Sequence, residues 1–350
     1  MSKQIVDLPA HAQRQIVAWL LLCCVLIFTM VVLGGVTRLT RSGLSMVDWH
    51  PVKGVVPPLS QPQWQKAFKR YQSFPEYKKI NHGMSLDEFK SIYWMEYSHR
   101  LLGRLIGIVF LLPLLYFLYR GYIRGPLIPK TITMFVLGGM QGVLGWYMVK
   151  SGLVDNPHVS QYRLTAHLMA AFIIYAYILW VALGLLFPKR EQSGGQNIPG
   201  LLRFSMIVTA VILVTVVAGG FVAGTKAGHV FNSYPLMNGQ WVPEGYMALQ
   251  PGWRNLFDNV ATVQFNHRWL GGIVLVMVLS LWVYAKRFLL SPRVRIVIHI
   301  LLLMVVVQFS LGVLTLLWAV PVSLGAAHQA SALLLFTSAL VVNHALWTYR

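Results

Sequence analysis

The feature that most constrains this chain is a series of eight apolar runs along its 350 residues. Each run is about 20 residues long, which is what an α-helix needs to cross the hydrocarbon core of a bilayer. Only 11% of the residues are charged, against about 25% in a soluble domain. We therefore expect an all-α membrane protein with eight transmembrane helices. The expected spans are 16–36, 99–119, 131–149, 164–187, 204–223, 267–285, 294–318 and 325–347.

The net charge of +19 would suggest a nucleic-acid partner in a soluble protein, but here the basic residues flank the apolar runs. The segments after the second, fourth and sixth runs are basic, with Glu191 as their one acid. Their basic residues are Arg120, Arg124, Lys130, Lys189, Arg190, Arg203, Lys286, Arg287, Arg293 and Arg295. The positive-inside rule places these segments and both termini in the cytoplasm. We expect a multi-pass protein of a bacterial inner membrane, surrounded by lipid and without a nucleic-acid partner.

Two long segments, 37–98 and 224–265, then lie on the outer side of the membrane and are rich in Pro, Trp and Tyr. The first is basic, but long loops cross the membrane largely regardless of charge. We expect residues 59–71 and 85–97 to form short helices on the membrane surface. The two cysteines, Cys23 and Cys24, are adjacent within the first run, so they cannot cross-link these outer segments.

The second half of the chain repeats the motifs of the first half in the same order. The matching motifs are Gly34-Gly35 and Gly219-Gly220, His99-Arg100 and His267-Arg268, Gln141-Gly142-Val143-Leu144-Gly145 and Gln308-Phe309-Ser310-Leu311-Gly312, and Ala166-His167 and Ala327-His328. Each half crosses the membrane an even number of times, so the two copies share one orientation. We expect two tandem, pseudo-symmetric four-helix bundles, residues 1–190 and 191–350.

Four histidines occupy equivalent places in this repeat, at the outer ends of the second, fourth, sixth and eighth runs. Ionisable residues within a membrane are costly and usually functional, and paired inward-facing histidines are how a bundle holds a metal or haem. The expected pairs are His99 with His167 and His267 with His328. A single histidine could instead hydrogen-bond a neighbouring helix, but four equivalent positions favour a cofactor.

Haem suits these pairs better than zinc does. Two axial imidazoles are enough for haem iron, whereas a zinc site wants further Cys, His or carboxylate ligands. Arg100 and Arg268 directly follow two of the histidines, where a guanidinium would bind a haem propionate or else anchor the helix at the headgroups. Four glycines would let a flat macrocycle approach the helices, or would serve helix packing instead: Gly103, Gly107, Gly271 and Gly272.

The two halves differ three residues before the first histidine of each pair. Glu96 precedes His99 by about one helical turn, and Gln264 takes the matching place before His267. Glu96 could serve its helix N-terminus through the dipole. If the helix begins there, however, its carboxylate faces the first haem pocket, where a proton-handling group would matter.

These motifs resemble those of the haem A synthase family, which takes part in cytochrome oxidase assembly. The resemblance covers nearly the whole chain and is to the branch shared by Gram-negative bacteria and mitochondria. It is most specific at Gly34 to Met46, Trp94 to Arg100, Phe265 to Arg268 and Ala327 to Gln329. The outer-loop cysteine pairs of some relatives are absent, so thiol-based electron entry is not carried over.

The resemblance implies that the protein converts haem O to haem A by oxidising a ring methyl to a formyl group. It implies a resident haem B on His267 and His328, haem O as substrate on His99 and His167, and a catalytic Glu96. A haem O synthase that delivers the substrate and an electron acceptor are implied partners, and the chain could form a homo-oligomer. Two histidines on the substrate iron would leave no position for oxygen, so the expected route is electron removal followed by attack of water.

Two other functions remain open at this point. A cytochrome-b-like electron carrier often stacks two haems in one bundle with two histidines on one helix, whereas each ligand helix here has one. A haem transporter or chaperone would suit the internal repeat, but its binding site would be expected near the membrane midplane rather than at one face.

Overall fold

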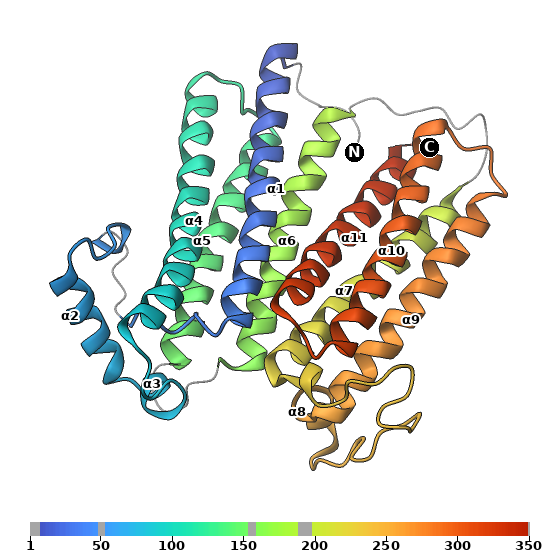
Figure 1. The fold of residues 1–350 in the computed structure, drawn as a ribbon. Helices are drawn as coiled ribbons and strands as arrows, with labels where there is room; N and C mark the ends of the chain where they lie inside the picture. The colour runs from blue at the N-terminus through green and yellow to red at the C-terminus, as the bar shows by residue number, and fades with distance from the viewer. Residues whose placement is uncertain (1–7, 48–52, 153–158, 188–197, 349–350) are drawn as a thin grey trace.

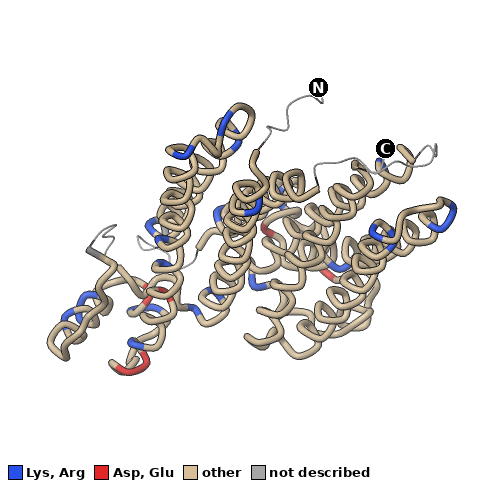
Figure 2. The backbone as a smooth tube through the Cα atoms, turned by 90° about the horizontal axis from the view of Figure 1, so that it is seen from above, with Lys and Arg blue, Asp and Glu red and all other residues tan. Residues whose placement is uncertain are grey.

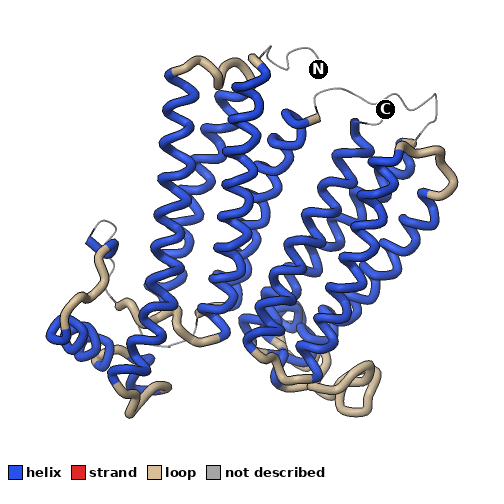
Figure 3. Tube along the Cα trace, turned by 45° about the horizontal axis from the view of Figure 1, so that its top comes forward, coloured by secondary structure: helices blue, strands red, loops and turns tan. Residues whose placement is uncertain are grey.

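The computed structural model describes residues 8–47, 53–152, 159–187 and 198–348. Regular structure in these residues is helical, apart from one isolated bridge between Met237 and Gln240 (Figure 3). Eight helices are long and apolar enough to cross a membrane, which confirms the expected class. They are α1 Ala10–Leu39, α4 Leu86–Tyr119, α5 Leu127–Gly152, α6 Gln161–Leu186, α7 Pro199–Thr225, α9 Val260–Ala285, α10 Pro292–Leu317 and α11 Val322–Thr348.

Short helices occupy the segments between the spans. α2 Gln61–Gln72 matches one expected surface helix, and α3 Pro75–Lys79 follows it. The second expected surface helix, 85–97, is wrong as a separate element, because these residues are the first turns of α4. A capping box between Ser85 and Glu88 starts that helix, and no proline or glycine interrupts it before His99. The remaining short elements are η1 Lys53–Val55, η2 Ala227–His229, η3 Gly252–Arg254 and α8 Asn255–Asp258.

The spanning helices form two groups of four (Figure 1). In the first group, α1 and α5 each contact both α4 and α6; in the second, α7 and α10 each contact both α9 and α11. Helices at equivalent places in the repeat therefore have equivalent neighbours. This is the pattern that two four-helix bundles would produce. The boundary at 190/191 lies outside the described residues, and the division into 1–190 and 191–350 stays a prediction.

The two groups meet along α1 and α6 on one side and α7 and α11 on the other. The contact of α1 with α11 and that of α7 with α6 are equivalent under the repeat. The hydroxyls of Tyr175 and Thr337 hydrogen-bond across this interface at 2.8 Å. Asp258 accepts hydrogen bonds from Gln161 and Tyr162 at its outer end, at 2.7 and 2.8 Å.

The described acidic residues are confined to one end of the spanning helices, whereas basic residues occur at both ends. The described acidic residues all lie in or next to the outer segments, at the end where α4, α6, α9 and α11 begin: Glu76, Asp87, Glu88, Glu96, Glu244 and Asp258. Basic residues lie in the turns that join α4 to α5 and α9 to α10 at the opposite end, and also in the segments that carry the acids (Figure 2). Lys189 and Arg190, expected among them, lie outside the described residues.

An aromatic cluster, formed by Trp64, Tyr71 and Phe89, fixes α2 and α3 on the first turns of α4. Glu76 of α3 is buried beside it, with 5% of its surface exposed. The Tyr71 hydroxyl donates to Glu76 Oε2 at 3.1 Å and accepts from Asn81 Nδ2 at 2.7 Å. Burial raises the pKa of Glu76 to about 7, because a single tyrosine hydroxyl does not replace the water that a carboxylate loses.

This raised pKa predicts that the outer segment loses stability as the pH rises. Between pH 4.5, the ordinary pKa, and about 7, the folded protein binds more protons than the unfolded chain, so the free energy of unfolding falls. The loss should be on the order of 2–3 kcal/mol. Thermal denaturation followed by tryptophan fluorescence should give a higher Tm at pH 5 than at pH 8. Glu76→Gln should abolish most of that difference, while the exposed Asp87→Asn should preserve it.

Candidate functional site

The second-half histidines face one another at the end of their group where α9 and α11 begin. The imidazole rings of His267 on α9 and His328 on α11 have centroids 6.4 Å apart and planes at 85°. An iron bonded at about 2 Å to one nitrogen of each ring would require a centroid separation of about 6 Å. The described residues contain no cluster of three or more His, Cys, Asp or Glu that could hold a bare metal ion. The pair therefore fits two axial ligands of a haem better than a zinc site.

One hydrogen bond fixes which nitrogen of His267 is available to a metal. Its Nδ1 lies 3.1 Å from the backbone oxygen of Thr215 on α7. A carbonyl oxygen can only accept, so Nδ1 carries the proton and the neutral ring keeps a lone pair on Nε2. Such a bond to the second nitrogen is the usual way a protein orients a histidine ligand.

The first half places His99 on α4 and His167 on α6, two helices that both contact α1 and α5. The Nδ1 atom of His167 is buried without a hydrogen-bond partner among the described residues. Gln141 of α5 donates to the backbone oxygen of His167 at 2.9 Å and so joins the two helices beside this histidine. The expected start of the second span, at residue 99, is wrong, because α4 begins at Leu86 and His99 lies well inside it.

Each of the four imidazoles packs against a glycine on a neighbouring helix. A Cβ at Gly34 would lie 3.1 Å from His99 Nε2, and one at Gly219 would lie 3.0 Å from His267 Cε1. Gly145 and Gly312 stand in the same way against His167 and His328, with Cβ distances of 3.0 and 2.9 Å to Cε1. The Gly312 distance is shorter than real Cβ atoms show, and the other three are tighter than most real Cβ contacts, so a larger residue at any of the four would press on its imidazole.

These four glycines were present in the repeated motifs, but the sequence did not connect them to the histidines. The glycines expected to make room for a macrocycle behave differently: a Cβ at Gly107, Gly271 or Gly272 would meet no atom within 4 Å, and one at Gly103 would meet only Met30. The usable signal was the spacing within Gln141–Gly145 and Gln308–Gly312. A Gln and a Gly four residues apart share one helix face, so they meet the same neighbouring helix.

Glu96 is held in a compact network at the outer end of the first half, with 2% of its surface exposed. Its Oε2 accepts hydrogen bonds from the Ser45 hydroxyl at 2.7 Å and from the Met46 amide at 2.8 Å. Its Oε1 pairs with the Arg100 guanidinium at 2.5 Å. Arg100 also donates to the backbone oxygen of Met46 at 3.0 Å. Ser45 and Met46 were not predicted as site residues, although both lie in the motif-rich stretch Gly34 to Met46.

The equivalent network in the second half lacks a carboxylate. Arg268 donates to the backbone oxygens of Phe231 at 2.8 Å and Ser233 at 2.7 Å, and Gln264 donates to Phe231 at 3.1 Å. Phe231 follows Gly219 by the same interval at which Met46 follows Gly34. Arg100 and Arg268 therefore donate to equivalent backbone positions in the two halves. Arg268 Nε and Gln264 Oε1 are buried without partners among the described residues. The Arg268 charge thus meets only carbonyl oxygens there, which favours a carboxylate ligand at this place.

Comparison with known proteins identifies the family of this chain. Residues 17–340 match the family model COX15-CtaA, described as cytochrome oxidase assembly protein. The chain belongs to this family. A protein named heme A synthase from Nitrosospira multiformis is 53% identical over 97% of this chain and 96% of its own length. Heme A synthase from Paramagnetospirillum magneticum is 46% identical over 97% and 95%, and human heme A synthase COX15 is 44% identical over 96% and 83%.

The glycine contacts predict a selective effect of adding one methyl group. Gly312→Ala should displace the His328 imidazole and lower the haem content of the purified protein, measured by Soret absorbance per protein, by severalfold. Gly184→Ala is the matched control, because a Cβ there meets no atom within 4 Å and the change adds helix propensity. Equal haem contents in the two variants would show that the contact does not position the ligand.

Proposed function

We propose that this protein is a haem A synthase, which oxidises haem O to haem A within the membrane. The observation that carries the proposal is the pair of repeat-equivalent histidine sites, of which, among the described residues, only the first has a buried carboxylate beside it. Two identical electron-carrying haems would not need this difference. Curated relatives named heme A synthase, similar over nearly the full chain, support the same conclusion.

The second half fits a resident haem B. His267 and His328 would be its axial ligands. Arg268 would bind a propionate carboxylate, because its guanidinium donates to backbone carbonyl oxygens and its Nε has no partner among the described residues. When bound, haem B supplies one-electron transfer. The role of the chain here is to fix both imidazoles through Gly219 and Gly312, and to hold His267 by its bond to Thr215.

The first half fits the substrate haem O, bound through His99 and His167. If both histidines ligate its iron, no iron position is open to dioxygen, so oxidation would take place at the edge of the porphyrin with water as the source of oxygen. Water labelled with ¹⁸O, supplied during turnover, should therefore label the formyl group of haem A. A formyl oxygen that comes from O₂ would eliminate this route.

Glu96 is the candidate acid–base group at the porphyrin edge. A carboxylate has about four acceptor positions, and Ser45, Met46 and Arg100 occupy three of them. The remaining position is on Oε1, where a proton from the attacking water could be taken up. The Ser45 and Met46 contacts keep the carboxylate in one orientation, and Arg100 balances its charge away from bulk water.

Glu96→Gln should separate haem binding from chemistry. The fold already accommodates a glutamine at this place, because Gln264 and Arg268 both donate to the Phe231 carbonyl in the second half. The variant should keep its haem content but lose at least 100-fold in the rate of haem A formation, within the usual range for a lost acid–base group. Chromatography of extracted haems measures both quantities, and Asp87→Asn on the same helix serves as control. A variant with undiminished activity would remove Glu96 from the mechanism.

Extracted pigment distinguishes the three candidate functions. A haem A synthase should contain haem B together with haem O or haem A, a cytochrome-b-like carrier should contain haem B alone, and a transporter should lack ligated haem. His267→Ala should deplete haem B selectively, while His99→Ala should deplete haem O and haem A. The opposite pattern would reverse the assignment of the two halves.

The membrane setting follows from the same proposal. The chain is a multi-pass membrane protein. The basic turns support cytoplasmic termini, and the histidines and Glu96 would then lie toward the periplasmic side of a bacterial inner membrane. A haem O synthase as the supplier of substrate and an electron acceptor remain expected partners, and self-association remains open.

A further inference from the structure

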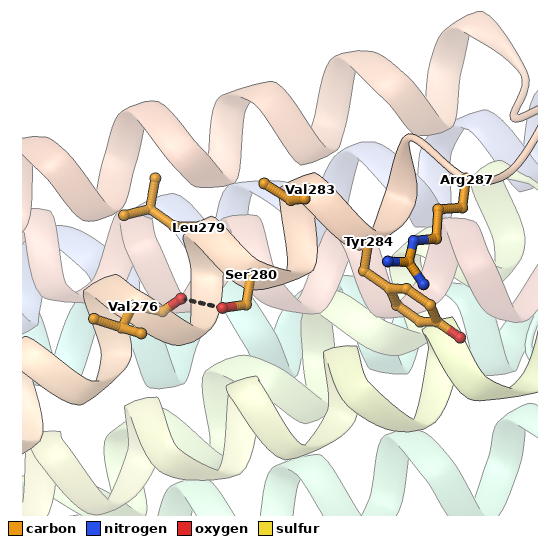
Figure 4. A pocket seen from close by; sticks show the side chains of 6 residues that line it. All are labelled: Val276, Leu279, Ser280, Val283, Tyr284 and Arg287. Carbon is orange, nitrogen blue, oxygen red and sulfur yellow. Dashed lines mark hydrogen bonds between the residues drawn. The ribbon is translucent and has the colours of Figure 1, made fainter.

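A groove on the lipid-facing side of α9 lies at the end of the protein opposite the histidines. It measures about 390 Å³ and is lined by Val276, Leu279, Ser280, Val283, Tyr284 and Arg287. Figure 4 shows Arg287 and Tyr284 together at one end of this row, with Val276 and Leu279 toward the other. The apolar side chains are exposed, Val276 to 61% and Val283 to 53%. The groove therefore presents an apolar floor with a cation and a hydroxyl at its mouth.

The length of the groove matches one leaflet of a bilayer. Val276 and Arg287 are separated by about 16 Å along the helix axis, and half of the hydrocarbon core is about 15 Å. An acyl chain that lies on Val276, Leu279 and Val283 would thus end near the midplane while its headgroup reaches Arg287. The Ser280 hydroxyl donates a hydrogen bond to the Val276 backbone oxygen at 2.8 Å. This hydroxyl is therefore already satisfied and does not make the apolar floor polar.

The mouth of the groove has several donors and no described acid. The Arg287 guanidinium lies 6.0 Å from the centre of the Tyr284 ring. The Tyr284 hydroxyl reaches the start of α7, where a Cβ at Gly200 would be only 3.1 Å away. α7 begins there without a side-chain cap from Ile198, and a long helix with an uncapped start attracts anions. The described acids all lie at the other end of the molecule, so a phosphate would meet positive potential here.

We propose that this groove binds an anionic phospholipid, with one acyl chain along α9 and the headgroup phosphate at Arg287 and Tyr284. Basic pockets between transmembrane helices are known to bind anionic headgroups. The occupant is a lipid rather than a second copy of the chain, because the donors lie at headgroup depth and the apolar row spans a single leaflet. The site is separate from both histidine pairs and does not depend on the proposed reaction.

The test is a lipid titration of the delipidated, full-length protein, with Tm as the readout. Phosphatidylglycerol should raise Tm with saturation, and phosphatidylcholine at equal concentration should raise it less. Arg287→Gln should weaken binding, so the half-saturating concentration of phosphatidylglycerol should rise roughly fivefold to tenfold. Arg295→Gln, at an exposed cation of α10 outside the groove, is the matched control and should titrate like the unaltered protein.

A second variant tests the apolar part without any change of charge. Val276→Trp fills the far end of the groove from an exposed position and should also weaken the phosphatidylglycerol response. The proposal fails if Arg287→Gln titrates normally, if Arg295→Gln weakens binding equally, or if both lipids act alike. It also fails if Arg287→Gln changes the oligomeric mass of the protein but leaves lipid binding unchanged. The groove would then be a contact between copies of the chain.

Discussion

The site depends on the close approach of helices at two glycine pairs. In each pair the first glycine, Gly34 or Gly219, admits an imidazole of its own helix group. The second contacts the other group: a Cβ at Gly35 would overlap Gln329 of α11, and one at Gly220 would overlap Thr165 of α6. One dipeptide therefore sets the position of a histidine ring and the distance between the two groups. Helices in lipid associate through packing of small residues, since burial from water cannot drive them together.

The same repeated helix arrangement supports two sites that differ in charge. Arg100 and Arg268 hold equivalent turns, through the backbone oxygens of Met46 and Phe231. In the first half Glu96 balances the arginine, and in the second Gln264 leaves it without a carboxylate. Removing one partner of a buried ion pair costs about 3–5 kcal/mol. A ligand carboxylate would supply the missing charge in the second half, whereas the first half already holds its own.

The sequence predicted the eight spans, the four equivalent histidines and the Glu96/Gln264 difference. Apolar length and motif spacing are local properties, so they can be read without knowledge of the fold. The start of α4 was missed, because a capping box at Ser85 extends the helix well beyond its apolar part. Hydropathy detects the segment within lipid and carries no signal for helix that continues into water.

What the sequence determined by itself is therefore the class of protein, its repeat and the residues that could bind haem. Only the tertiary structure decided which glycine meets which histidine and what holds Glu96. Ser45 is 51 residues from Glu96 in the chain, and Tyr175 is 162 residues from Thr337, so no local pattern records these contacts. They arise because packing in lipid selects helix faces by shape, and shape complementarity between distant segments exists only once the helices are assembled.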